Sequence, residues 1–180
     1  GGIGTASRRT RAGHMVGVLA QANYGLRSQL RIAGVPVGRE ITEGRIRDDE
    51  AGSLIVIVAT DAPLAPHQLK RLARRPTLAL GRMGSVSGDG SGDLFLAFST
   101  ANDVPVQPGK PGSVQLLPTG DLTPLFAAVV EATEEAIVNA LVAAETMTGR
   151  DGHTAMALPH DRLREVLRKH GKLEEVTSDR

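Results

Sequence analysis

The chain has 180 residues, 41% of them hydrophobic, no cysteine, and a formal net charge of +1 from 21 basic and 20 acidic residues. This size and composition predict one soluble globular domain, and the balanced charge disfavours a nucleic-acid partner, which would need a basic face to neutralise phosphates. The absence of cysteine excludes disulfides, thiolate catalysis and cysteine-ligated zinc. No apolar run approaches the roughly 20 residues of a membrane span, so we expect a cytoplasmic protein without membrane or nucleic-acid partners.

The spacing of apolar residues and turn signals predicts three buried strands and three helices. Strands are expected at residues 14–23, 53–59 and 92–98, and helices at residues 67–83, 123–148 and from residue 161 onward. The strand at residues 53–59 is apolar almost throughout, as in a sheet covered on both faces.

Proline and glycine mark the ends and the interruptions of these elements. Pro66 suits a first helical turn, whereas Pro76 should break the helix that follows it. Thr123 is expected to cap the long apolar helix, which should lie buried between layers. The remaining segments are an edge strand or hairpin at residues 30–41, a mobile surface loop at residues 42–52 and a flexible linker at residues 84–90.

A serine between two glycines stands directly before the third strand. If the bond between Gly90 and Ser91 is cut, Ser91 acquires a free α-amine, which can act as the base that activates its own hydroxyl. Gly90 tolerates the strained backbone needed for that hydroxyl to attack the preceding carbonyl. The alternative is an ordinary glycine-rich turn into a strand. None of the five histidines has metal-ligand spacing or an evident nucleophile partner, so a Ser-His-Asp site is not indicated.

Other polar residues at buried elements could support such a nucleophile. Asn23 ends the first strand at a glycine turn, where its amide could bind an oxyanion, or it is a plain turn residue. Glu131 and Glu135 lie one helical turn apart, so these carboxylates either form a solvent-facing stripe or need partners such as an amine or an arginine. Asp61 is most simply a turn or capping residue.

Together these segments closely resemble the L-aminopeptidase/D-esterase and β-peptidyl aminopeptidase family of self-cleaving hydrolases, relatives of the nylon-oligomer hydrolases. The resemblance covers nearly the whole chain. Its matching segments are residues 1–7, 16–25, 34–38, 59–64, 90–93, 132–136, 144–149 and 157–163.

This resemblance implies an α/β fold, a four-layer α/β/β/α sandwich, in one self-processing domain over residues 1–180. Residues 1–90 would end the α-chain part and residues 91–180 would form the β-chain part, with cleavage at Gly90-Ser91. The family's pattern gives Ser91 as the nucleophile, Asn23 as the oxyanion donor and Thr133 with Glu135 as the supporting pair. Residues i and i+2 are about 200° apart on a regular helix, so Glu131 or Glu134 could replace Glu135. The family's N-terminal segment, with a lysine and a tyrosine of the site, does not appear before Gly1.

The resemblance further implies an aminopeptidase or amidase that acts on short peptides, amides or esters through an acyl-enzyme on Ser91. No metal or organic cofactor is expected. Its partners would be the N-terminal segment of the same precursor and further copies, as a homo-oligomer of four or more. Two alternatives are a catalytically silent binding or assembly subunit, suggested by threonine at 133, and an acyl transferase like the ornithine acetyltransferases, which use a threonine nucleophile.

Overall fold

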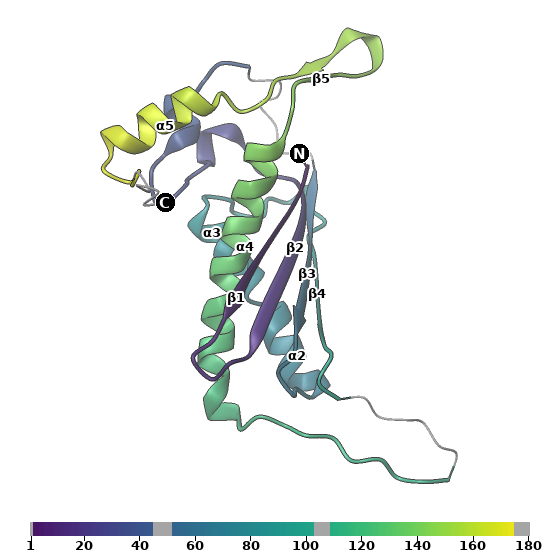
Figure 1. Ribbon diagram of the computed structural model, residues 1–180. Helices are drawn as coiled ribbons and strands as arrows, with labels where there is room; N and C mark the ends of the chain where they lie inside the picture. The colour runs from purple at the N-terminus through teal and green to yellow at the C-terminus, as the bar shows by residue number, and fades with distance from the viewer. Residues whose placement is uncertain (1, 45–51, 103–108, 175–180) are drawn as a thin grey trace, which may run out of the picture.

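The computed structural model describes residues 2–44, 52–102 and 109–174, which form a four-stranded sheet with helices packed on one face (Figure 1). The strands are β1 (Gly2–Arg9), β2 (Met15–Asn23), β3 (Ser53–Thr60) and β4 (Leu94–Ser99), in that spatial order. β1, β2 and β3 are antiparallel neighbours, whereas β4 runs parallel to β3. The parallel pair requires a crossover, which α2 (Pro66–Ala73) and α3 (Pro76–Arg82) provide.

The long helix α4 (Thr123–Ala143) packs on β1 and β2, while α2 packs on β4. In β2 and β3 every second residue faces these helices and is buried, as the period of a strand requires. The shared core consists mainly of valine, leucine, isoleucine and alanine. Because β4 joins the sheet formed by β1 to β3, residues before and after Ser91 share this core.

Smaller elements complete the chain around this layer. They are η1 (Arg27–Gln29), α1 (Val37–Glu40), η2 (Thr119–Leu122), β5 (Met147–Thr148), η3 (Arg150–Gly152), β6 (Thr154–Ala155) and α5 (His160–Lys169). No helix within the described ranges is both long and apolar enough to cross a bilayer.

The three predicted strands and the predicted helices are confirmed, with differences at the ends of elements. The helix break at Pro76 is confirmed, since α2 ends at Ala73 and α3 begins at Pro76. The long helix is shorter than expected, because Ala144 adopts extended backbone with ψ of 135°. Thr123 is not its cap: Leu122 holds the N-cap position and no side chain caps the helix.

The strand β1 was not predicted, because its glycines resemble a turn. Gly4 is required for packing instead: a Cβ at this position would overlap the Ala136 carbonyl of α4 and lie 2.6 Å from the Ala140 amide nitrogen. Glycine within a strand often marks such a close approach of another backbone. The glycines that look like a turn in the sequence are therefore explained by the close contact between β1 and α4.

The edge strand expected at residues 30–41 is wrong, and the hairpin is reduced to one bridge. Ile32 and Val35 pair once across a turn in which Ala33 and Gly34 have φ of 51° and 81°. α1 follows directly and packs with α5 around a second small core. In the loop expected at residues 42–52, residues 45–51 lie outside the described residues.

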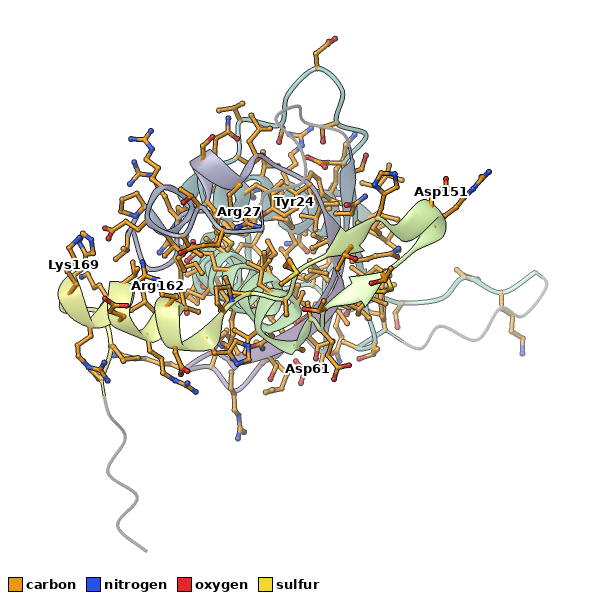
Figure 2. All side chains as sticks on the ribbon, turned by 90° about the horizontal axis from the view of Figure 1, so that it is seen from above. Tyr24, Arg27, Asp61, Asp151, Arg162 and Lys169 are labelled. Atoms are coloured by element: carbon orange, nitrogen blue, oxygen red, sulfur yellow. The ribbon has the colours of Figure 1, made fainter. Side chains whose placement is uncertain are left out.

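An acidic residue tethers α5, the yellow helix that carries Lys169 in Figure 2, to α1. Glu40 accepts hydrogen bonds from Lys169 at 2.9 Å and from His170 at 2.5 Å. These bonds and the charges of the two partners lower the pKa of Glu40.

A carboxylate with a lowered pKa stabilises the folded state above its usual pKa of 4.5, and this contribution disappears as the pH falls through the lowered value. We expect the amides of α5 to lose hydrogen-exchange protection as the pH falls below 4.5, while Glu40→Gln shows the reduced protection at every pH. Equal, pH-independent protection in both proteins would contradict this tether.

The second face of the sheet is left uncovered by residues 2–44, 52–102 and 109–174, and it carries large apolar side chains. Their exposed fractions range from 37% to 63%: Ile3, Met15, Leu19, Ile55, Leu94, Leu96 and Phe98. An apolar patch of this kind marks a contact surface. Within the described residues, the strand expected at residues 53–59 is covered on one face only, since Ile55 is 39% exposed on the other.

Candidate active site

Ser91 follows a tight turn at the end of the sheet where β4 begins. Its amide N–H donates to the Gly88 carbonyl at 2.8 Å, which closes a four-residue turn around Gly90. The Ser91 hydroxyl is buried and has no hydrogen-bond partner among the residues that the structure describes. An unpaired buried hydroxyl calls for an explanation, and a reactive role is one.

The structure brings Asn23 to the same end of the sheet as Ser91. Asn23 ends β2 and lies opposite Ser53, the first residue of β3. The Ser53 hydroxyl accepts a hydrogen bond from the amide of Gly92 at 2.9 Å. Ser53 thus pairs with Asn23 in the sheet and bonds to the residue that follows Ser91.

Thr133 and Glu135 are not brought to Ser91. Thr133 is fully buried, and its hydroxyl donates to the Val129 carbonyl at 2.7 Å within α4. Glu135 is half-exposed and forms an ion pair at 2.5 Å with Arg8 of β1, the opposite edge of the sheet from β4. Thr133 and Glu135 are two positions apart on a regular helix, so their side chains face different directions. Their supporting role stays a prediction.

The carboxylates of α4 have arginine partners, one of the two possibilities left open by the sequence. Arg8 also contacts Glu131, at 3.4 Å. Glu134 lies 2.6 Å from Nε of Arg82, an ion pair without hydrogen-bond geometry. Burial raises the pKa of Glu134, Arg82 opposes this shift and Glu131 adds to it. These contacts account for the acidic residues as links between α4 and its neighbours.

Sequence reasoning missed three residues near Ser91: Ser53, Asp93 and Tyr24. Asp93 accepts hydrogen bonds from the Leu54 amide at 2.8 Å and from the Ser87 hydroxyl at 3.2 Å. Burial, together with the charge of Asp93, raises the pKa of the Tyr24 phenol, which keeps it protonated. The signal in the sequence that could have found two of them is their place: Ser53 begins the apolar strand β3, and Asp93 directly precedes the apolar strand β4.

Asp61 lies at the other end of β2, where its carboxylate accepts a hydrogen bond from the Met15 amide at 2.8 Å. The N-cap of α2 is Ala65, so Asp61 does not cap that helix, and its bond joins the end of β3 to the start of β2 instead.

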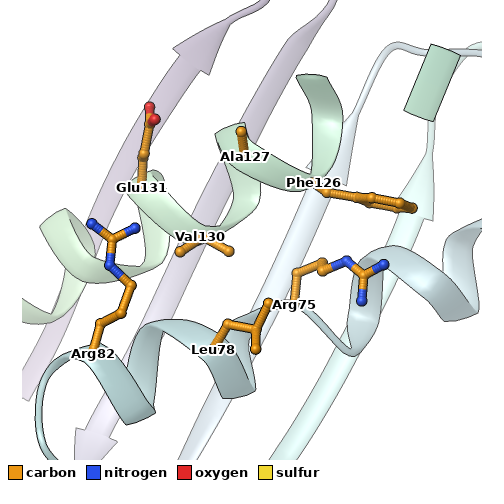
Figure 3. Close-up of a pocket in the computed structure, with 7 residues that line it drawn as sticks. All are labelled: Arg75, Leu78, Arg82, Phe126, Ala127, Val130 and Glu131. Carbon is orange, nitrogen blue, oxygen red and sulfur yellow. The ribbon is translucent and has the colours of Figure 1, made fainter. Parts of the chain in front are cut away.

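A separate groove of about 440 Å³ lies between α3 and α4 (Figure 3). The Arg75 guanidinium stacks on the Phe126 ring at 3.9 Å from its centroid, and Leu78 and Val130 form the apolar wall. No side chain that lines this groove is a nucleophile of the Ser, Thr or Cys type. The groove is therefore distinct from the Ser91 site.

Gly52 fixes the position of Asn23 through a close approach of two backbones. Its φ is 150°, and a Cβ there would overlap the Asn23 carbonyl and lie 3.0 Å from the Asn23 side-chain amide nitrogen. We expect Gly52→Ala to displace Asn23 and to lower the free energy of unfolding by roughly 1–3 kcal/mol.

The matched control is Gly13→Ala, since Gly13 also has a positive φ of 93° but would place its methyl in open space. The expectation is checked by thermal unfolding of both variants and by the rate at which the chain is cleaved at Gly90-Ser91 in each. Equal behaviour of the two variants would show that backbone strain alone, and not the Asn23 contact, is responsible.

The fold and this site define the class of protein. The structure matches the L-aminopeptidase D-Ala-esterase/amidase of Ochrobactrum anthropi with a TM-score of 0.88 and 45% identity, over 97% of this chain and 49% of that one. That structure is reported as a prototype for the serine aminopeptidases and a variant of the Ntn hydrolase fold. The PH0078 protein of Pyrococcus horikoshii OT3 matches with a TM-score of 0.87 and 45% identity, over 95% of this chain and 48% of its own. The expected α/β class is confirmed.

Residues 1–155 match the profile of peptidase family S58, and the chain belongs to this family. It is also 46% identical, over 192 aligned residues, to Beta-peptidyl aminopeptidase BapA of Sphingosinicella microcystinivorans. That alignment covers 96% of this chain and 48% of the relative. The chain thus spans about half the length of the curated relatives that it matches.

Proposed function

We propose that this chain is the nucleophile-bearing part of a self-processing S58 aminopeptidase or amidase, which releases N-terminal residues from short peptides, amides or esters. The observation that carries the proposal is the buried hydroxyl of Ser91, which has no hydrogen-bond partner within the described part of the chain and lies in a glycine-rich turn at the Asn23 end of the sheet. The family and the relatives' names support the reaction class.

The first step is cleavage of the chain at Gly90-Ser91. The Ser91 oxygen attacks the Gly90 carbonyl carbon, the C–N bond breaks, and the hydroxyl proton passes to the released α-amine. Water then hydrolyses the resulting ester, which gives a Gly90 carboxylate and restores the hydroxyl. Ser91 now carries nucleophile and base on one residue.

The second step is turnover of substrate by the same hydroxyl. The Ser91 amine takes the hydroxyl proton as the oxygen attacks the substrate carbonyl, and the amine leaving group takes that proton as it departs. Asn23 donates its amide to the developing oxyanion, a contribution that in other hydrolases is worth a 10²- to 10³-fold change in kcat. Water completes the cycle by hydrolysing the acyl-enzyme.

The N-terminal segment of the same precursor is the proposed partner of the uncovered sheet face. The alternating row of exposed Leu94, Leu96 and Phe98 on β4 supports this, because it continues the apolar residues of β1 to β3 on the same face. A second sheet packed there would complete the four-layer sandwich. The half-length match to the relatives is consistent with this partner. A homo-oligomer of four or more copies belongs to the proposal through family resemblance. A cytoplasmic location belongs to it through the sequence, in which no membrane span was found.

A catalytically silent assembly subunit is the second candidate. One observation favours it. The Thr133 hydroxyl bonds to the backbone of α4 and Glu135 pairs with Arg8, so neither bonds to Ser91. Such a protein would use its uncovered sheet face without cleaving the chain.

Intact mass and N-terminal sequencing of the complete gene product that contains this chain distinguish the two. The hydrolase should yield a fragment that begins with Ser91 and should release product from a panel of α-, β- and D-aminoacyl amides. A correctly folded protein that stays whole and inert would support the silent subunit and exclude the hydrolase.

A further inference from the structure

Two side chains connect the loop around Ser91 to the start of β3. The Ser53 hydroxyl accepts a hydrogen bond from the Gly92 amide at 2.9 Å, and the Asp93 carboxylate accepts one from the Leu54 amide at 2.8 Å. Each bond joins residues 39 positions apart in the sequence. The pair forms a reciprocal clamp, in which a side chain from each segment holds the backbone of the other.

The clamp continues on the N-terminal side of Ser91. The second Asp93 oxygen accepts a hydrogen bond from the Ser87 hydroxyl at 3.2 Å, and the Ser91 amide donates to Gly88 at 2.8 Å. The loop is therefore held before and after the scissile bond. The Ser91 hydroxyl is the group left without a partner among the described residues at this point.

Asp93 also takes the place of a backbone partner in the sheet. Regular pairing of β3 with β4 begins at Ile55 and Leu94, so the Leu54 amide lies just beyond the ladder and would be unpaired without the Asp93 carboxylate. A buried amide that lacks a partner is costly. Asp93 thus determines where β4 starts, and with it the position of Ser91 two residues earlier.

We propose that Ser53 and Asp93 are positioning residues for the Ser91 reaction, which act by holding the Gly90-Ser91 peptide and the Ser91 hydroxyl in attack geometry. This inference rests on the proposed function, since it assigns the residues that support the same nucleophile. Displacement of a reacting group by about 1 Å can cost on the order of 10²-fold in rate.

The test compares the rate of chain cleavage in variants of the complete gene product that contains this chain. Ser53→Ala and Asp93→Ala should slow the appearance of the Ser91 fragment at least about 10-fold, and Ser53→Thr, which keeps a hydroxyl, should restore it to within about 3-fold. Intact mass over time measures each rate.

Ser99→Ala is the matched control. The Ser99 hydroxyl also bonds a backbone group, the Ala62 carbonyl at 2.6 Å, but at the opposite end of the β3–β4 pair. It should lose a comparable amount of thermal stability without a comparable loss of cleavage rate. If Ser53 had a purely structural role, cleavage in Ser53→Ala and in Ser99→Ala would slow in proportion to each variant's loss of stability.

The outcomes separate the clamp from the proposed function. If wild type is cleaved and Ser53→Ala is cleaved at the same rate, the clamp is wrong and the hydrolase stands. If folded wild type is never cleaved, the hydrolase and the clamp both fail. Slow cleavage in Ser53→Ala with rescue by Ser53→Thr supports both.

Discussion

Replacement of Ser91 by alanine is expected to abolish both chain cleavage and substrate turnover. Without the hydroxyl there is no group to attack the Gly90 carbonyl, so the α-amine is never released. Loss of a covalent nucleophile typically lowers the rate by on the order of 10³-fold or more. Intact mass should show one uncleaved chain, and aminoacyl amide hydrolysis should fall to the background rate.

Two further variants make the result specific to the hydroxyl. Ser113→Ala removes a hydroxyl from an exposed loop residue and should change neither reaction. Ser91→Cys keeps a nucleophile at the same position and should retain measurable cleavage, because a thiol can also attack an acyl carbon. Continued cleavage in Ser91→Ala would assign the reaction to another residue.

Replacement of Gly4 by alanine is expected to be among the most destabilising single changes in the chain. The added methyl would overlap the Ala136 carbonyl and lie 2.6 Å from the Ala140 amide nitrogen. Both are backbone atoms of α4, which cannot rotate away as a flexible side chain would. We expect the free energy of unfolding to fall by roughly 3 kcal/mol, or roughly 6–12 °C in Tm for a domain of this size.

Gly17→Ala is the control for Gly4→Ala, because Gly17 also lies within a strand but a Cβ there would meet no atom within 4 Å. Its effect should stay within about 0.5 kcal/mol. Thermal and urea unfolding of the two variants measure the difference. A similar small effect at both glycines would mean that α4 does not press on β1 as the structure shows.

The sequence by itself determined the local elements and the position of the candidate nucleophile. Short apolar runs bounded by turn signals predicted β2, β3 and β4, and Pro76 predicted the boundary between α2 and α3, because proline ends a helix. The glycines around Ser91 indicated a reactive turn, since the conformation and the small side chains are local properties. These features depend on neighbouring residues alone.

Only the tertiary structure decided which residues meet at Ser91. The contacts of Ser53 and Asp93 join segments 39 residues apart, and no local pattern encodes such a pairing. The packing of α4 explains the glycines of β1, which look like a turn in the sequence. The ion pair with Arg8 places Glu135 at the β1 edge of the sheet, opposite β4. Register, close approach and the direction of a side chain are set by the other layer of the fold, and so they appear only when that layer is in place.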